Sequence, residues 1–156
     1  MKIGIITCST RSYAGTRPDA TGPLIADELE KAGYDVVGPV VVPDDVDAIR
    51  GELATQLYIG VDAVITTGGT GLTPGDVTPE AITPLLDRQI PGIAETLRAV
   101  SREKVPTSVL SRGVAGAIGA TFVVTLPGST GGVRDGLAVL LPVLDHLYDQ
   151  LHGGDH

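Results

Sequence analysis

The stretch TTGGTGLTPGDVTPEA combines glycines, hydroxyl side chains and a carboxylate directly after an apolar run. At Gly68, Gly69 and Gly71 the missing side chains let main-chain N–H groups approach an anion closely. The hydroxyls of Thr67 and Thr70 can donate further hydrogen bonds to the same ligand. We therefore predict an anion-binding site here. The alternative is a strand-to-helix turn that needs glycine only for its backbone angles.

This segment differs from two common nucleotide-binding loops. No Gly-Lys-Ser/Thr sequence follows the glycines at the spacing of a P-loop, and Pro74 stands in place of the third glycine of a dinucleotide fingerprint. P-loop NTPases and Rossmann dehydrogenases are therefore disfavoured.

Two aspartates, Asp44 and Asp76, each lie between a predicted strand and a predicted helix. Carboxylate oxygens are the ligands that Mg²⁺ prefers, and a bound Mg²⁺ neutralises phosphate charge in place of the missing lysine. We predict that both aspartates hold Mg²⁺. In the alternative interpretation they only cap the helices that follow them.

Other polar residues give weaker signals. Cys8 is predicted to be a small buried residue, with pocket lining as the alternative. Arg112 and Arg134 are predicted to form surface ion pairs, although each adjoins the region where an anion would bind. The three histidines show no metal-ligand spacing and are predicted to be solvated: His146, His152 and His156.

Alternating strands and helices must position these residues. The predicted strands cover residues 2–7, 34–42, 61–67, 108–112 and 120–126, and the small residues at 113–120 read as a loop. Gly38 and Pro39 indicate that the second strand is kinked or at an edge. Helices are predicted from Thr21 to Gly33, from Asp44 or Asp45 to Gly60, after an N-cap at Thr78, from Pro91, and from Val133 to Leu147 as the C-terminal helix.

This order predicts an α/β fold with three layers, in which a doubly wound, mostly parallel sheet carries helices on both faces. We expect residues 1–156 to form one domain. The loops after parallel strands meet at one edge of the sheet. Ser9, Gly128 and Ser129 should therefore lie beside the glycine-rich loop and Asp44.

Charge and composition limit the ligands. The net charge is −8, so the surface should repel nucleic acid and anionic lipid. The sequence contains no run of eighteen apolar residues, so no membrane span is predicted. The single cysteine favours a cytoplasmic location, and the first residues read as a strand rather than a signal peptide.

The glycine-rich motif, together with the later sequences IPGIAETLR, VPTSVLSRGVAG and TLPGS, resembles the MogA and MoaB family of molybdenum cofactor biosynthesis proteins. The resemblance covers nearly the whole chain and extends to the corresponding domain of gephyrin. It implies a homotrimer that binds molybdopterin and ATP. It also implies Mg²⁺-dependent adenylyl transfer, which gives adenylyl-molybdopterin and pyrophosphate.

The same resemblance assigns roles to residues. It implies that Asp44 and Asp76 are catalytic or bind the metal, and that Ser9, Ser129 and the loop glycines bind substrate. Three positions depart from the common pattern: Thr10 replaces an aspartate, Gly75 an arginine, and Gly131 a lysine. The loss of arginine and lysine favours one alternative, a non-catalytic molybdopterin-binding or scaffold protein. An interaction domain like those fused in larger homologues is a further alternative.

Overall fold

A six-stranded sheet forms the centre of the protein in the computed structural model, which describes residues 1–155. The strand order is β2-β1-β3-β6-β5-β4. The strands are β1 (Lys2–Cys8), β2 (Asp35–Val42), β3 (Ala63–Thr67), β4 (Arg88–Gln89), β5 (Ala115–Ile118) and β6 (Thr121–Leu126).

The sheet is mostly parallel, as predicted. Strands β2, β1, β3 and β6 pair in parallel, whereas β5 is antiparallel to both of its neighbours. Strand β2 lies at an edge, and its register against β1 shifts near Gly38, where the Gly38–Pro39 peptide bond is cis. The predicted kink and edge position are therefore both confirmed.

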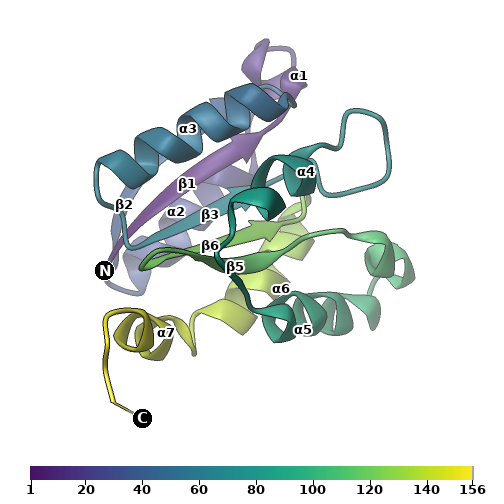
Figure 1. Cartoon of the computed structure of the whole chain (residues 1–156). Helices are drawn as coiled ribbons and strands as arrows, with labels where there is room; N and C mark the ends of the chain where they lie inside the picture. The colour runs from purple at the N-terminus through teal and green to yellow at the C-terminus, as the bar shows by residue number, and fades with distance from the viewer. Residues whose placement is uncertain (156) are drawn as a thin grey trace.

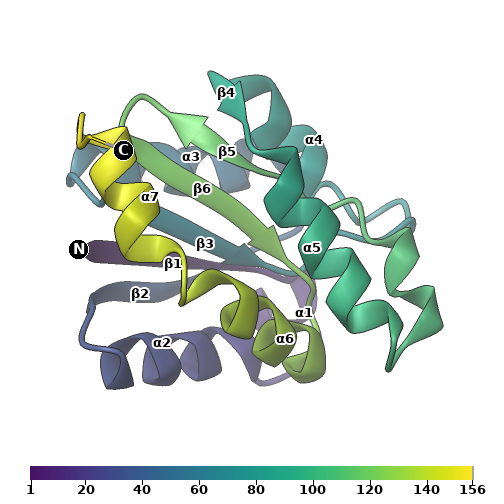
Figure 2. The ribbon, with the colours of Figure 1, turned by 90° about the horizontal axis from the view of Figure 1, so that it is seen from below.

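Helices cover both faces of the sheet and complete three layers (Figures 1 and 2). One face carries α3 (Val46–Tyr58), α4 (Thr78–Ile82) and the 3₁₀ helix η1 (Thr83–Leu85). The opposite face carries α2 (Thr21–Lys31), α5 (Pro91–Arg102), α6 (Thr130–Leu140) and α7 (Leu144–Leu151). Among residues 1–155, no helix is long and apolar enough to cross a membrane.

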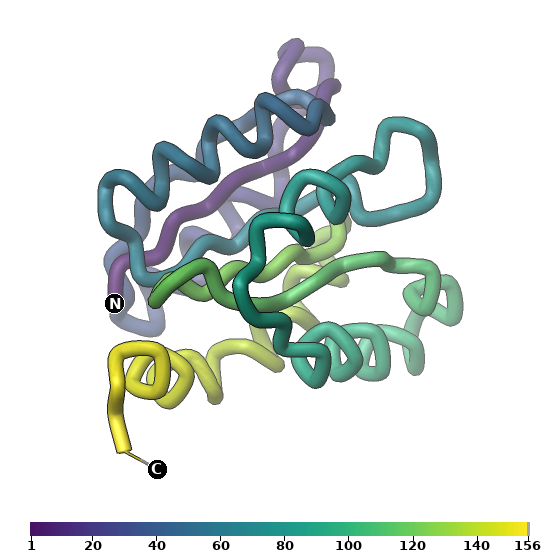
Figure 3. Tube along the Cα trace, in the orientation of Figure 1, coloured from purple at the N-terminus to yellow at the C-terminus, as the bar shows by residue number. Residues whose placement is uncertain are grey.

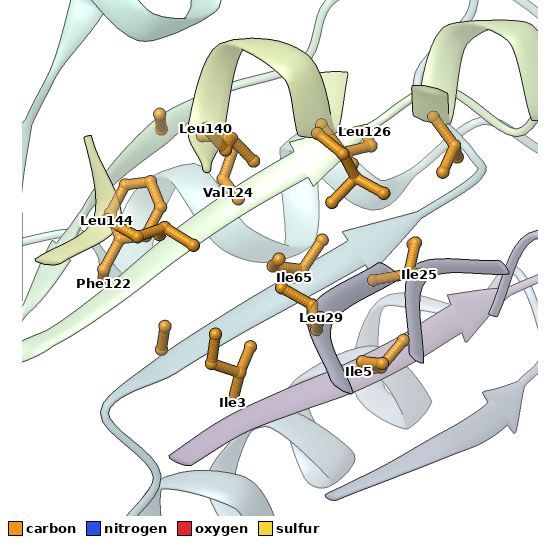
Figure 4. Packing of buried hydrophobic residues seen from close by; sticks show 14 residues of the cluster. Ile3, Ile5, Ile25, Leu29, Ile65, Phe122, Val124, Leu126, Leu140 and Leu144 are labelled. Carbon is orange, nitrogen blue, oxygen red and sulfur yellow. The ribbon is translucent and has the colours of Figure 1, made fainter. Parts of the chain in front are cut away.

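The core is aliphatic, and the alternation of strand residues divides it between the two faces. Ile3, Ile5 and Ile65 pack toward α2, α6 and α7, together with Phe122 (Figure 4). Ile6 packs instead against α3 and α4 on the other face. Burial of both faces explains why these strands read as continuous apolar runs.

Two predictions for residues 108–120 are wrong. Residues 106–110 form the 3₁₀ helix η2 (Pro106–Leu110), because Pro106 starts a turn and the apolar side chains after it remain exposed. The small residues that read as a loop form β5. A side chain at Gly116 would collide with the Arg88 carbonyl, so small size permits close pairing with β4, which was not predicted.

Helix boundaries also differ from prediction. Thr21 and Thr78 are first helical residues rather than N-caps, and the Asp19 carboxylate accepts the hydrogen bond from Thr21 N. A short helix, α1 (Thr10–Tyr13), replaces part of a predicted loop. The C-terminal helix is divided in two near Pro142, which cannot continue the hydrogen-bond ladder.

The chain reverses its winding direction between β1 and β3. From β1 it passes outward to the edge strand β2, and then returns through α3 to β3 on the other side of β1. Figure 3 shows that the N-terminus and the last described residues lie at the opposite end of the sheet from the loops after these strands. Such a switch point is where open α/β sheets bind ligands.

We predict that Ile65→Ala lowers the free energy of unfolding by about 2–5 kcal/mol, because it leaves a cavity in the central strand of a closed core. Ile65 is fully buried. Urea denaturation followed by circular dichroism measures the change. Tyr58→Ala serves as the control, since Tyr58 is 93% exposed and its loss should change stability by less than about 0.5 kcal/mol. Equal effects of both substitutions would contradict this description of the core.

Candidate functional site

A cleft of about 580 Å³ lies beyond the carboxyl ends of β1, β3 and β6. It contains all but one of the predicted site residues, drawn from four separate loops. Those lining it are Ser9, Asp44, Gly68, Gly69, Thr70, Gly71, Asp76, Gly128 and Ser129. The exception is Thr67, which is buried and donates its hydroxyl hydrogen to the Pro127 carbonyl 2.8 Å away.

The glycine-rich loop presents main-chain donors to this cleft. Gly68 N donates to Leu126 O at 3.1 Å, which ties the loop to the end of β6. The N–H groups of Gly69, Thr70 and Gly71 have no acceptor within residues 1–155. Unpaired amides in a polar cleft are suited to an anionic ligand.

Glycine is required where the loop passes the two aspartates. Gly69 has a φ angle of 66°, and a methyl group there would lie 3.2 Å from Asp44 Oδ1 and collide with the Thr78 hydroxyl. A methyl group at Gly71 would lie 2.7 Å from Asp76 Oδ2. The loop backbone therefore runs directly beside both carboxylates.

Asp44 and its neighbour Asp45 have separate tasks. Asp45 is the N-cap of α3, and its side chain accepts a hydrogen bond from Ala48 N at 2.9 Å. Asp44 faces the cleft, where Oδ2 accepts from Thr10 N at 2.8 Å and Oδ1 accepts no hydrogen bond from residues 1–155. Capping thus accounts for Asp45 and leaves Asp44 available to a ligand.

Asp76 closes a tight turn in the loop between β3 and α4, which projects beyond the sheet in Figure 1. Asp76 N donates to Thr73 O at 2.9 Å, with Pro74 and Gly75 at the two central positions. Its Oδ2 accepts from Thr73 N at 2.9 Å and from the Thr73 hydroxyl at 2.7 Å. Oδ1 accepts no hydrogen bond in the part of the chain that the structure describes.

These donors fit Mg²⁺ that is bound together with a phosphate ligand. Asp44 and Asp76 each keep one carboxylate oxygen free, and no group of three acidic, histidine or cysteine side chains within residues 1–155 is arranged to hold a metal by itself. Mg²⁺ is usually held by one or two carboxylates plus substrate phosphates. The pair is therefore suited to a metal that arrives with its substrate.

The two predicted serines of the site also begin helices. Ser9 Oγ accepts from Ser12 N at 3.2 Å at the start of α1, and Ser129 Oγ accepts from Gly132 N at 3.1 Å at the start of α6. Both hydroxyl hydrogens remain able to donate to a ligand in the cleft.

Cys8 is buried and also lines the cleft, so both interpretations of it hold. Burial raises the pKa of the thiol to about 12, against a smaller lowering by the hydrogen bond with Thr78. The thiol is therefore neutral at physiological pH and does not act as a nucleophile there. His146 and His152 are exposed on or beside α7, away from the cleft, and His156 lies outside the described residues.

Three charged residues of the cleft were not predicted. Arg11 and Arg17 line it and are exposed, and neither forms an ion pair within residues 1–155. Asp19 lines it too, accepting from the Thr7 hydroxyl at 2.8 Å as well as from the first amides of α2. The Asp-Ala-Thr-Gly sequence before α2 is a capping signal for Asp19, but no local pattern marks the arginines.

A second pocket of about 550 Å³ shares Thr70, Gly71 and Ser129 with the cleft. Val105 and Leu110 give it apolar walls. Its polar groups are Ser101, Thr107, Ser108, Ser111, Lys104, Arg134 and Asp135. The two pockets therefore offer a polar and a more apolar compartment on either side of the glycine-rich loop.

The two arginines singled out in the sequence differ in their surroundings. Arg112 forms the predicted ion pair, with Glu80, and its remaining contacts are with backbone carbonyls. The Arg112 guanidinium lowers the pKa of Glu80 by hydrogen bonding to its carboxylate. Arg134 forms no ion pair with another residue of the described chain and lines the second pocket.

Known proteins resemble this chain along nearly its whole length. It is 40% identical over 151 residues to molybdopterin adenylyltransferase of Pyrococcus furiosus, covering 94% of this chain and 88% of that protein. It is 39% identical over 147 residues to molybdenum cofactor biosynthesis protein B of Escherichia coli K12, covering 92% and 85%. The structure of the molybdopterin biosynthesis Mog protein from Mycobacterium ulcerans superposes with a TM-score of 0.91 at 47% identity, covering 96% and 98%.

Some relatives are longer. The chain spans 50% of the molybdenum cofactor biosynthesis bifunctional protein of Chlorobaculum tepidum, to which it is 36% identical over 155 residues, and 21% of gephyrin of Dictyostelium discoideum. Residues 4–146 match the family described as a probable molybdopterin binding domain. The chain therefore belongs to the molybdopterin-binding domain family of molybdenum cofactor biosynthesis proteins.

Proposed function

We propose that this protein transfers the adenylyl group of ATP to molybdopterin in a reaction that requires Mg²⁺. The observation that carries the proposal is the cleft itself, in which Asp44 and Asp76 lie beside a loop with three free amides. Donors for a polyanion and ligands for a hard cation occur in one place. Membership of the family and the named activity of the Pyrococcus furiosus relative support this choice.

The two pockets suit the two substrates. The polar cleft, with its amides, carboxylates, Arg11 and Arg17, matches the triphosphate of ATP. The second pocket, with Val105 and Leu110 beside several hydroxyls, matches a flat heterocycle that also needs hydrogen bonds. Because both pockets share Thr70 and Gly71, the reacting phosphates meet at the glycine-rich loop.

In the proposed reaction, an oxygen of the molybdopterin phosphate attacks the α-phosphorus of ATP. The bond from that phosphorus to the bridging oxygen breaks, and pyrophosphate leaves. Asp44 and Asp76 would hold Mg²⁺, which supplies charge neutralisation when bound. The amides of residues 69–71 stabilise phosphate oxygens and fix the two reactants in line, which is the main source of catalysis in phosphoryl transfer.

Assembly and location follow from the same proposal. The family resemblance leads us to expect a homotrimer, and the single cysteine, Cys8, leads us to expect a cytoplasmic protein.

We predict that Asp44→Asn lowers the rate of pyrophosphate release about 100-fold or more, because it removes a metal-binding charge from the cleft. Asparagine retains an oxygen that can accept the Thr10 amide, so folding should be preserved. Release of pyrophosphate from ATP and molybdopterin is measured with a coupled phosphate assay, and folding by circular dichroism.

The neighbouring change Asp45→Asn is the matched control for this variant. It removes the same charge one residue away, and asparagine still caps α3. Its turnover should stay within about twofold of the wild type. Wild-type turnover in Asp44→Asn, or an equal loss in both variants, would refute the assignment of Asp44.

We also predict that Arg17→Gln weakens ATP binding about tenfold, because a hydrogen bond to a charged group is lost from the triphosphate. The difference from wild type should shrink as salt is raised. Isothermal titration calorimetry with ATP and Mg²⁺ measures it. Arg102→Gln is the control, since Arg102 is exposed on α5 and does not line the cleft. Unchanged affinity in Arg17→Gln would exclude Arg17 from the triphosphate site.

The same calorimetry separates an enzyme from a protein that only binds the pterin. We expect wild-type protein to bind ATP in the presence of Mg²⁺ and to lose most of that affinity in EDTA. A protein that binds molybdopterin but shows no Mg²⁺-dependent ATP affinity would refute adenylyl transfer.

A further inference from the structure

The arch between β3 and α4, formed by residues 71–76, carries Asp76 on exposed residues that pack little against the core. Leu72 is 65% exposed, and residues 73–75 are exposed as well. The internal bonds of this arch are the turn from Thr73 to Asp76 and the bonds from Thr73 to the Asp76 carboxylate. These bonds shape the turn, but they do not hold it against the rest of the protein.

Arg112 supplies that connection through both its main chain and its side chain. Its N–H donates to Thr70 O at 2.8 Å, just before the arch begins. Its Nε donates to Gly71 O at 2.8 Å, and Nη2 donates to Asp76 O at 2.7 Å. One guanidinium thus joins the first and the last residue of the arch.

The third nitrogen of the guanidinium links Arg112 to α4, the helix that follows the arch. Nη1 donates to the carboxylate of Glu80, in the first turn of α4. Arg112 is itself held, because Arg98 of α5 donates to Ser111 O at 3.3 Å and to Gly113 O at 3.1 Å. Contacts therefore run from α5 through the segment 111–113 to the arch.

We infer that Arg112 is the positioning residue for Asp76, and that its guanidinium acts by fixing the arch rather than by binding substrate anions. All three of its nitrogens already donate a hydrogen bond within the protein, and Arg112 lines neither of the two pockets. The planar fork matters because a lysine ammonium cannot reach these three acceptors in one geometry. This inference rests on the proposed function only where turnover is measured.

The first test needs no substrate. Hydrogen exchange of the amides at residues 71–77 is measured in Arg112→Gln and in Arg50→Gln by mass spectrometry. Arg50 is the matched control, because it donates to Ala81 O at 2.9 Å and Glu80 O at 3.2 Å in α4 but does not touch the arch. We expect exchange about tenfold faster in Arg112→Gln, as local opening becomes easier, and near the wild-type rate in Arg50→Gln.

The second test is kinetic. Displacement of a reacting group by about 1 Å costs up to about 100-fold in rate, so kcat of Arg112→Gln should fall by about that factor while the KM for ATP stays within about threefold. Arg112→Lys should be equally impaired, whereas Arg50→Gln should retain kcat. Higher Mg²⁺ should be needed for half-maximal ATP binding in both Arg112 variants.

The outcomes are distinguishable. Wild-type exchange at residues 71–77 in Arg112→Gln overturns the inference, as does wild-type kcat in Arg112→Lys, which would indicate that only the positive charge matters. If Arg112→Gln does not fold, the exchange measurement on Arg112→Lys decides in its place. If wild-type protein shows no turnover, the proposed function fails, while the exchange result still decides whether Arg112 fixes the arch.

Discussion

The site depends on three parallel strands, β1, β3 and β6, that end at the same height along one edge of the sheet. Thr7, Thr67 and Leu126 stand side by side in the register of β1, β3 and β6. The residues that follow them therefore emerge at one height, and their loops meet without long connections. The register is set by the core, where Ile5, Ile65 and Val124 are also paired and buried. A slip of one residue would move these side chains to the wrong face, so packing of the core also aligns the loops.

Hydrogen bonds between the aligned loops hold them in place around the cleft. Ser9 N donates to Val42 O, Gly68 N to Leu126 O, and the Thr78 hydroxyl to Gly68 O, each at 2.9–3.1 Å. Thr10 and Asp44 bond reciprocally, through Thr10 N to the carboxylate and Asp44 N to the Thr10 hydroxyl. Thr10 is thus compatible with a formed site where the family resemblance implies an aspartate, because its hydroxyl accepts the hydrogen bond from Asp44 N.

Much of the fold could be predicted from sequence, because β1, β3 and β6 are apolar runs and α2, α3 and α5 have regular apolar spacing. The strand β5 could not, since Ala115, Gly116 and Ala117 resemble a loop until the approach of β4 is known. For the candidate site, Asp44, Asp76 and the glycines carried local signals. The positions of Arg17 and Asp19 in the cleft could not be predicted, because they depend on the path of the loop after α1. The hydrogen bonds from Arg112 to Gly71 O and Asp76 O join residues more than thirty positions apart in the sequence, so no local pattern predicts them.

A strongly acidic protein with the proposed function must attract two polyanions locally, against its net charge of −8. Lysine at the glycine-rich loop would bring one charge on a flexible stem, whereas three fixed amides bring several dipoles at no cost in side-chain entropy. The carboxylates beside those amides would oppose an anion by themselves, and the proposed Mg²⁺ would neutralise that repulsion. Gly75, where the family resemblance implies an arginine, occupies a central position of the Thr73–Asp76 turn and brings no charge to the cleft. Arg11 and Arg17 are therefore the arginines that supply positive charge to the cleft.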